Sequence, residues 1–209
     1  MNGRAVLLVG GVLAGPLFTL AWVVGEAITP RYSAMRNLVS ELALGRFGWL
    51  PEAGFYVSGV LVLGLAFGLW WAFRPVRLVW APIIIGLVGL SLIGAGHFQE
   101  DPANGFPPGT PVIPTTRTMH GELHDVFGDV IIYGLPIAAL LFLRAFHTLG
   151  RRAWLVYSLV TGLATFVVSF VAKLDPRDVA EAGLQQRIGL TIDFLWLTLV
   201  AAFALRTDG

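Results

Sequence analysis

The sequence contains no cysteine, which excludes disulfide bonds, iron–sulfur clusters and zinc sites built from thiolates. Charged residues are also scarce, at 13% of the chain. The 14 basic and 13 acidic residues give a formal net charge of +1, so no basic excess points to nucleic acid as a partner. Any metal bound by this chain therefore needs histidine and carboxylate ligands.

Apolar residues, in contrast, are abundant: 56% of the 209 residues are hydrophobic, and the mean hydropathy is +0.76. This is more apolar surface than one soluble core buries, so we expect membrane lipid to solvate it. Six runs approach the ~20 residues that a membrane span requires. They are Ala5–Ile28, Ala53–Phe73, Leu78–Gly96, Val126–Leu143, Ala153–Val171 and Ile188–Leu205. Because helices satisfy their own backbone polar groups, the sequence predicts an all-α fold, a polytopic bundle of six transmembrane helices forming one domain over residues 1–209.

The distribution of basic residues indicates how the bundle is oriented. With six spans, both termini share one side with the short loops 74–77 and 144–152, and this side concentrates its basic residues in few positions. They are Arg4, Arg74, Arg77, Arg144, Arg151, Arg152 and Arg206. The other side has as many, diluted over three longer loops that hold most of the acidic residues. The positive-inside rule weights short loops, so we predict a multi-pass cell-membrane protein with cytoplasmic termini and with loops 29–52, 97–125 and 172–187 outside.

A histidine pair lies in the predicted outer segments. The stretch 119–125 should open the fourth helix, with Thr116 or Thr118 as its N-cap. His120 and His124 are four residues apart, so in a helix they share a face with ~5–6 Å between their Cβ atoms. This spacing lets both imidazoles bind one Zn²⁺ at ~2.0–2.1 Å.

Further residues complete a catalytic hypothesis around that pair. His97 or Asp101, which follow the third predicted helix, is the candidate third zinc ligand. Zinc would lower the pKa of bound water to about 7, with Glu41 or Asp101 as the general base. Ser40 or Arg187 would stabilise the developing oxyanion. The competing interpretation is that these are polar side chains at helix ends, where water solvates histidines and carboxylates at little cost.

Three acidic residues fall inside or near the ends of predicted spans: Glu26, Asp129 and Asp193. An ionised carboxylate within a span costs at least ~2.5 kcal/mol, so such residues face the bundle interior. Arg187 and Lys173 are candidate partners for them. A proton or ion path is the functional alternative to simple pairing.

Several short motifs along nearly the whole chain resemble the bacterial and archaeal family called domain of unknown function 998. They are Ser40-Glu41-Leu42, Phe98 with Asp101, His120-Gly121 with His124, and Gln186-Arg187. The resemblance implies a six-helix membrane fold and carries no activity. In the family pattern the aspartate and the two histidines are regular, whereas His97 is a departure. That departure weighs against a site with three histidine ligands.

A looser analogy concerns chemistry alone. Intramembrane hydrolases of the alkaline ceramidase and adiponectin receptor type also gather a histidine, an H-x-x-x-H pair, a serine and an aspartate, although their helix count and motif order differ. Two functions follow as hypotheses: a zinc-dependent hydrolase acting on a lipid amide or ester, and a non-enzymatic membrane protein that binds lipid, serves as a scaffold or transports a small solute. The sequence leaves open whether the chain is an enzyme and what its oligomeric state is.

Overall fold

The computed structural model describes residues 2–113, 116–174 and 180–207, and for residues 172–174 it describes the backbone alone. Six long helices account for most of it, together with two short 3₁₀ helices. They are α1 (Gly3–Ile28), η1 (Ser40–Leu44), α2 (Trp49–Ala72), η2 (Arg74–Val76), α3 (Trp80–His97), α4 (Met119–Thr148), α5 (Arg152–Leu174) and α6 (Ala182–Thr207). All six long helices contain a stretch long and apolar enough to cross a membrane, and the described residues contain no β-strand. The predicted all-α bundle of six spans is confirmed.

Most helices extend beyond the apolar runs that predicted them, although α3 begins at Trp80, after the predicted start at Leu78. α4 begins at Met119 rather than at Val126, because Thr118 caps the helix. The Thr118 hydroxyl accepts a hydrogen bond from the amide of Gly121 at 3.1 Å. The choice of Thr118 as N-cap is therefore confirmed. Likewise α6 begins at Ala182 rather than Ile188. Hydropathy detects only the lipid-solvated part of each helix, whereas the capped ends continue into the polar interface.

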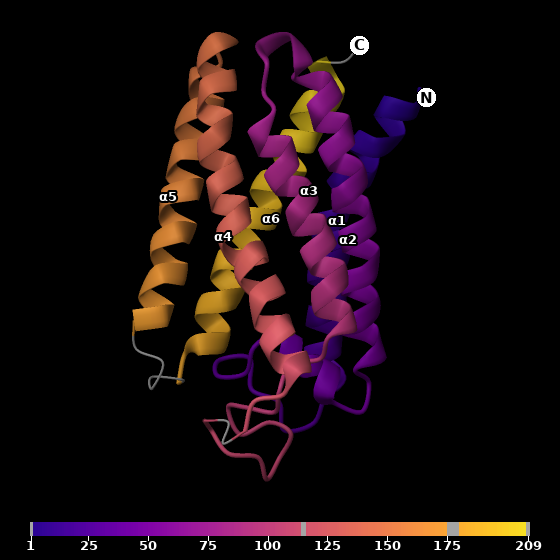
Figure 1. Cartoon of the computed structure of the whole chain (residues 1–209), viewed down its shortest axis with the longest axis vertical. Coiled ribbons are helices and arrows are strands. Elements are labelled where there is room, and N and C mark those ends of the chain that lie inside the picture. Colours follow the sequence, from indigo (N-terminus) through magenta and orange to yellow (C-terminus); the bar gives the residue numbers. More distant parts are fainter. Residues whose placement is uncertain (1, 114–115, 175–179, 208–209) are drawn as a thin grey trace.

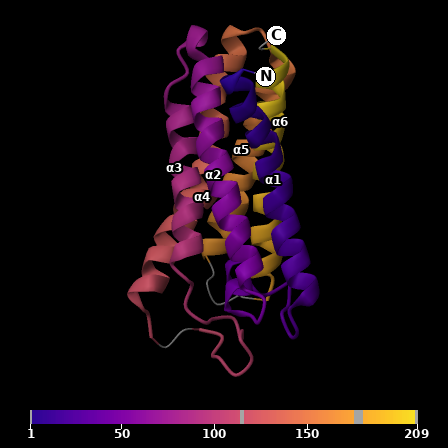
Figure 2. The same cartoon turned by 90° about the vertical axis from the view of Figure 1, so that its right-hand side faces the viewer.

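The helices form a bundle in which chain neighbours pack side by side and α6 closes the arrangement against α1. Figures 1 and 2 show both termini at one end of the bundle and the long connections at the other. We call the latter the distal end; it carries the segments 29–48, 98–113 and 116–118. The distal end is the one that the sequence predicts to lie outside.

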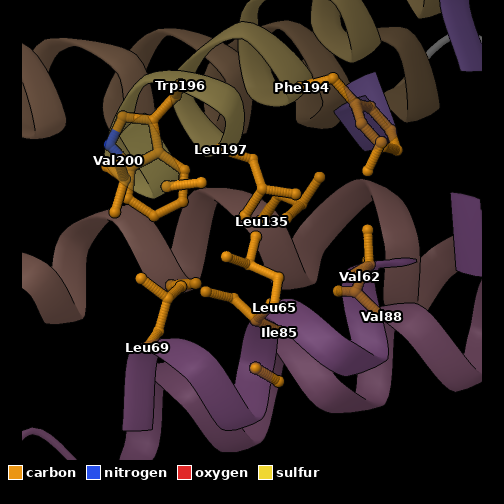
Figure 3. Packing of buried hydrophobic residues seen from close by; sticks show 14 of the residues in the cluster. Val62, Leu65, Leu69, Ile85, Val88, Leu135, Phe194, Trp196, Leu197 and Val200 are labelled. Atoms are coloured by element: carbon orange, nitrogen blue, oxygen red, sulfur yellow. The ribbon is translucent and has the colours of Figure 1, made fainter. Parts of the chain in front are cut away.

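The interior of the bundle is packed with apolar side chains from α2, α3, α4 and α6, among them Leu65, Ile85, Leu135 and Leu197 (Figure 3). Trp196 is fully buried here, and its indole nitrogen donates a hydrogen bond to the hydroxyl of Ser158 on α5 at 2.9 Å. The one polar atom of this large side chain thus has a partner inside the bundle.

Glycines allow α2 and α3 to approach closely. A Cβ atom at Gly89 would lie 2.8 Å from the backbone nitrogen of Leu63, and one at Gly59 would lie 2.8 Å from the backbone oxygen of Gly89. Such contacts between backbones exclude any larger residue at the crossing, as is common where small residues mediate helix packing in lipid. The close packing fixes the distal end of α3, from which the candidate site continues.

Candidate functional site

A polar cavity of about 450 Å³ lies at the distal end, between η1, the segment after α3, the first turns of α4 and the start of α6. We call it the distal cavity. Its polar lining residues are Ser40, Glu100, Asp101, Asn104, Arg117, His124, Asp125, Asp129 and Gln186. Four of these are acidic, whereas Arg117 and His124 supply the basic groups.

Ser40, Glu100 and His124 form a chain of contacts in this cavity. The Ser40 hydroxyl donates a hydrogen bond to Oε2 of Glu100, and the same oxygen lies 3.8 Å from Nε2 of His124. On the other side of the imidazole, Nδ1 of His124 lies 2.7 Å from the carbonyl oxygen of Phe98 and 3.1 Å from that of Ala95. Since both partners are acceptors, Nδ1 carries the hydrogen and Nε2 faces Glu100.

The protonation of Glu100 depends on its burial. Burial raises the pKa of the Glu100 carboxyl group, and the neighbouring His124 and the Ser40 hydroxyl oppose that rise. A carboxyl group with a raised pKa keeps its proton to a higher pH than an exposed glutamate does. The three side chains therefore form a unit able to accept or donate a proton at the cavity wall.

Glu41, the neighbour of Ser40, lies deeper and does not line the cavity. It is fully buried, and its two oxygens accept hydrogen bonds from the amide of Leu38 at 2.9 Å and from the side-chain amide of Asn104 at 2.8 Å. Burial, with a smaller contribution from the nearby Glu100 carboxylate, raises the pKa of Glu41 to about 8. Its ties to the 29–38 segment and to Asn104 hold two loops of the distal end together.

Asp101 lines the cavity and also holds the start of α4. Its carboxylate accepts hydrogen bonds from the amide of Thr118 at 2.8 Å and from the Thr118 hydroxyl at 2.6 Å. Burial by itself would raise the pKa of Asp101, but these two hydrogen bonds and the positive charge of Arg117 outweigh it and lower that pKa. Asp101 is therefore ionised, and its carboxylate stabilises the start of α4 through Thr118.

His120 and His97 lie outside the cavity. Both side chains are exposed, and their rings flank the ring of Phe98, with centroid distances of 5.3 Å and 4.9 Å respectively. His124, by contrast, is buried beneath them. Over residues 2–113, 116–174 and 180–207, no group of three or more histidine, aspartate and glutamate side chains is arranged to hold a metal ion. The predicted zinc site stays a prediction, and it requires rearrangement of these side chains.

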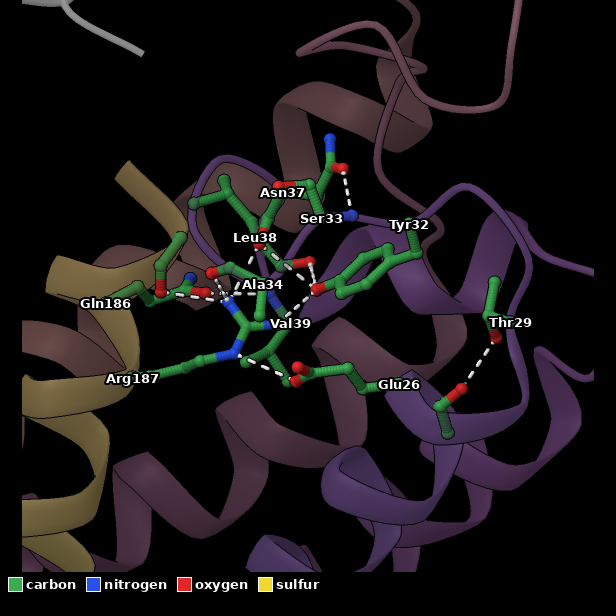
Figure 4. Close-up of polar contacts among 12 residues, drawn as sticks. Glu26, Thr29, Tyr32, Ser33, Ala34, Asn37, Leu38, Val39, Gln186 and Arg187 are labelled. Carbon is green, nitrogen blue, oxygen red and sulfur yellow. Dashed lines mark hydrogen bonds and ion pairs between the residues drawn. The ribbon is translucent and has the colours of Figure 1, made fainter. Parts of the chain in front are cut away.

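Arg187 belongs to a separate network that joins α6 to the segment after α1 (Figure 4). Its Nη1 atom donates to three backbone carbonyl oxygens, those of Ala34 and Asn37 at 2.8 Å and that of Gly183 at 2.9 Å. Its Nε atom lies 3.3 Å from Oε2 of Glu26, which confirms the predicted pairing of these residues. The guanidinium is fully engaged in holding the fold of the distal end.

The same guanidinium is enclosed by aromatic rings. It lies 5.5 Å from the ring centroids of Trp22 and Tyr32, and it also donates to the Tyr32 hydroxyl. The other predicted cationic partner, Lys173, has a side chain outside the described residues.

The carboxylates within the spans have different surroundings. Asp129 lines the distal cavity, whereas Asp193 is buried at 3% exposure and lines a second cavity of about 260 Å³ between α4, α5 and α6. We call this the inner cavity. The prediction that Asp193 points into the bundle is confirmed. The two cavities are neighbours, because four residues line both: Leu38, Asn104, Ile132 and Gln186.

Sequence reasoning grouped Glu100 with the polar residues of this face and gave it no role, and it did not single out Asn104 as a site residue. The available signal was position: Glu100 directly precedes Asp101, and Asn104 lies three residues beyond Asp101 in the same proline-rich connection. Nothing in their spacing reveals that this connection folds back over η1.

Comparison with known proteins identifies a family. The model of the family described as "Protein of unknown function (DUF998)" matches residues 12–203, a range that reaches from α1 into α6. No curated protein and no solved structure matches the chain.

Proposed function

Because the chain belongs to the family of proteins of unknown function named DUF998, whose description assigns no activity, we propose a function from the distal cavity itself. We propose that this cavity binds the headgroup of a membrane lipid that carries an ammonium group. The chain is a multi-pass membrane protein, so lipid headgroups surround both ends of its spans.

The charge of the cavity supports this ligand class and carries the proposal. Four carboxyl groups, those of Glu100, Asp101, Asp125 and Asp129, face the cavity, and among the described residues its lining has a single guanidinium, that of Arg117. Arg117 forms an ion pair with Asp125 and lies 3.9 Å from Asp101. An excess of carboxylates attracts a cation, and an ammonium group offers several donors to them.

The position of Arg117 suits the remainder of such a headgroup. Its side chain is half exposed, at 49%, so the guanidinium lies at the rim of the cavity. A zwitterionic phosphoethanolamine headgroup would place its ammonium among the carboxylates and its phosphate near Arg117. A phosphoglycerol headgroup carries the same phosphate but ends in a neutral glycerol, which offers the carboxylates no positive charge.

A cavity-filling variant tests the proposal. A Cβ atom at Gly128, which lines the distal cavity, would meet no atom within 4 Å, so Gly128→Leu should fill the cavity without displacing the backbone. Gly3→Leu is the matched control, since Gly3 is equally open and lies at the other end of the bundle. We expect native mass spectrometry of the purified protein to show phosphatidylethanolamine bound in preference to phosphatidylglycerol. Gly128→Leu should bind it about tenfold more weakly, a loss of ~1.4 kcal/mol.

Two results would contradict this function. One is equal binding of phosphatidylethanolamine and phosphatidylglycerol by the wild-type protein. The other is unchanged phosphatidylethanolamine binding by Gly128→Leu while that variant remains folded.

A second candidate function is the zinc-dependent hydrolysis of a lipid amide or ester. The observation that favours it is the separation of 3.8 Å between Nε2 of His124 and Oε2 of Glu100, both on the same cavity. One Zn²⁺ at ~2.0–2.2 Å from each atom fits that separation after a small adjustment. A third ligand would have to come from His120, His97 or Asp101 by movement of a side chain. Zinc would then activate a water molecule, and Ser40 would lie beside the reacting group.

Elemental analysis of the purified protein tests this candidate directly. The expected result is about one zinc ion per chain, lost in His124→Ala and retained in His147→Ala, because His147 is exposed near the opposite end of α4. Zinc-free wild-type protein that still binds lipid would refute the hydrolase and leave the binding function intact.

A further inference from the structure

The inner cavity has features that headgroup binding at the distal end does not require. We propose that it is a binding site for a small organic ammonium ion, with Asp193 as the counter-ion, and that binding releases one proton. This site is distinct from the headgroup site and does not rest on it.

Asp193 is the polar group that defines the site. It is the twelfth residue of α6, about 16 Å along the helix from Ala182, which places it near the middle of this 26-residue helix. Its side chain is 3% exposed, and among the described residues its Oδ1 atom has no hydrogen-bond partner. A buried carboxyl oxygen without a described partner, on a residue that lines a cavity, is an open acceptor position.

Among the described residues, the hydrogen bonding of Thr165 favours a carboxyl group on Asp193 that holds a proton. The side chain of Asp193 forms a hydrogen bond with the hydroxyl of Thr165 on α5. The Thr165 hydroxyl has a single hydrogen, and it donates that hydrogen to the carbonyl oxygen of Thr161 at 2.9 Å. Both bonds form together when a protonated Asp193 donates to the Thr165 oxygen.

The other groups around Asp193 leave it without a cationic partner in the part of the chain that the structure describes. Tyr133 of α4 lines the same cavity, and Tyr157 of α5 lies close enough to interact with its charge. Arg187, on α6 itself, is committed to Glu26 and to backbone carbonyls. None of the described side chains therefore supplies the counter-charge for an ionised Asp193, and a cationic ligand in the inner cavity would supply it.

The size and walls of the cavity favour an organic cation over a bare metal ion. A volume of about 260 Å³ exceeds the needs of a single ion. One part of the wall is apolar, formed by Ile132, Val168 and Leu190, which suits a short alkyl chain. The other part offers hydrogen-bonding side chains, those of Asn104, Tyr133, Ser169, Gln185 and Gln186.

The exchange is balanced in charge and atoms. The ammonium ion enters from water, Asp193 loses its proton, and the ammonium donates a hydrogen bond to the carboxylate at Oδ1. One proton leaves to water for each cation bound, so the net charge of the cavity does not change. The inner cavity adjoins the distal cavity, with which it shares four lining residues.

Calorimetric titration of the purified protein with n-butylammonium chloride at pH 7 tests this inference. Measuring in two buffers with different ionisation enthalpies gives the number of protons released, and we expect about one per cation bound. Asp193→Asn should reduce the affinity at least about tenfold and abolish proton release. Thr198→Val is the control, because it removes a hydroxyl oxygen on α6 that is also buried and has no partner among the described residues. This variant should change neither the affinity nor the number of protons released.

A cavity-filling variant keeps the test independent of the charge change. A Cβ atom at Gly189 would meet only the hydroxyl oxygen of Ser169, at 3.9 Å, so Gly189→Leu should occupy the inner cavity and also abolish butylammonium binding. Asp193→Asn should retain phosphatidylethanolamine binding, so the failure of one proposal is distinguishable from the failure of the other. Binding without proton release, or equal affinity in wild type, Asp193→Asn and Gly189→Leu, would overturn the inference.

Discussion

Gly121 lies directly against the carboxylate of Asp101, so closely that a Cβ atom at position 121 would be 2.2 Å from Oδ2 of Asp101. This contact is what allows Asp101 to reach the amide and hydroxyl of Thr118 at the start of α4. The glycine that follows His120 is therefore required by the capping of α4, independently of any metal.

Gly121→Ala should displace Asp101 and break both of its hydrogen bonds to Thr118. Each bond to a charged acceptor contributes ~1.5–3 kcal/mol, so loss of both should lower the free energy of unfolding by about 3–6 kcal/mol. Thermal unfolding of the detergent-purified protein measures the effect. Gly128→Ala is the control, because a Cβ atom there meets nothing within 4 Å. Equal stability of the two variants would show that Asp101 does not need the space at Gly121.

Arg187 supports the distal end through contacts that lysine cannot reproduce. Arg187→Lys keeps the charge but loses the planar group that reaches Glu26 and the carbonyl oxygens of Ala34 and Asn37 at once. Because buried acceptors would be left without donors, we expect a loss of about 2–4 kcal/mol in the free energy of unfolding. Arg152→Lys, at an exposed position, should change it by less than ~0.5 kcal/mol. Comparable unfolding curves for both variants would contradict this role.

The membrane fold could be predicted from the sequence because its signal is local. Each of the six helices contains an apolar run that a single window of residues reveals. Helix ends were less accessible to this reasoning, since the start of α4 depends on Thr118 and on Asp101, seventeen positions away from it.

The candidate site was only partly predictable, and the reason is the kind of partner that each side chain has. His124 was identified by its spacing from His120, but its Nδ1 contacts are backbone carbonyl oxygens, which leave no trace in a residue pattern. The same holds for Arg187, which was predicted as an ion-pair partner and also binds three carbonyl oxygens. Glu100 belongs to the candidate site because it contacts Ser40, which is sixty positions away in the sequence.

The orientation of the bundle is open to a direct measurement. Since the basic residues are concentrated in the short loops at the end that carries the termini, we expect a reporter fused after Gly209 to be active only in the cytoplasm. A second fusion in the 98–118 segment should report the opposite side and serves as the internal control. Reversed signals from the two fusions would place the distal cavity in the cytoplasm.

The raised pKa of Glu41 predicts how stability depends on pH. The folded-state pKa is about 8, against an ordinary value of 4.5, so between these values the folded protein binds more protons than the unfolded chain. Stability contributed by Glu41 is therefore fully present below about pH 4.5 and is lost as the pH rises toward 8. Each unit of pKa difference corresponds to ~1.4 kcal/mol, so the loss amounts to a few kcal/mol.

Chemical denaturation between pH 5 and 8 tests this dependence. The free energy of unfolding should change less steeply with pH for Glu41→Gln than for wild type. Glu122→Gln, at an exposed position, should retain the wild-type slope. If Glu41→Gln also retained the wild-type slope, Glu41 would titrate near its ordinary pKa. Groups other than Leu38 and Asn104 would then have to compensate the burial of its charge.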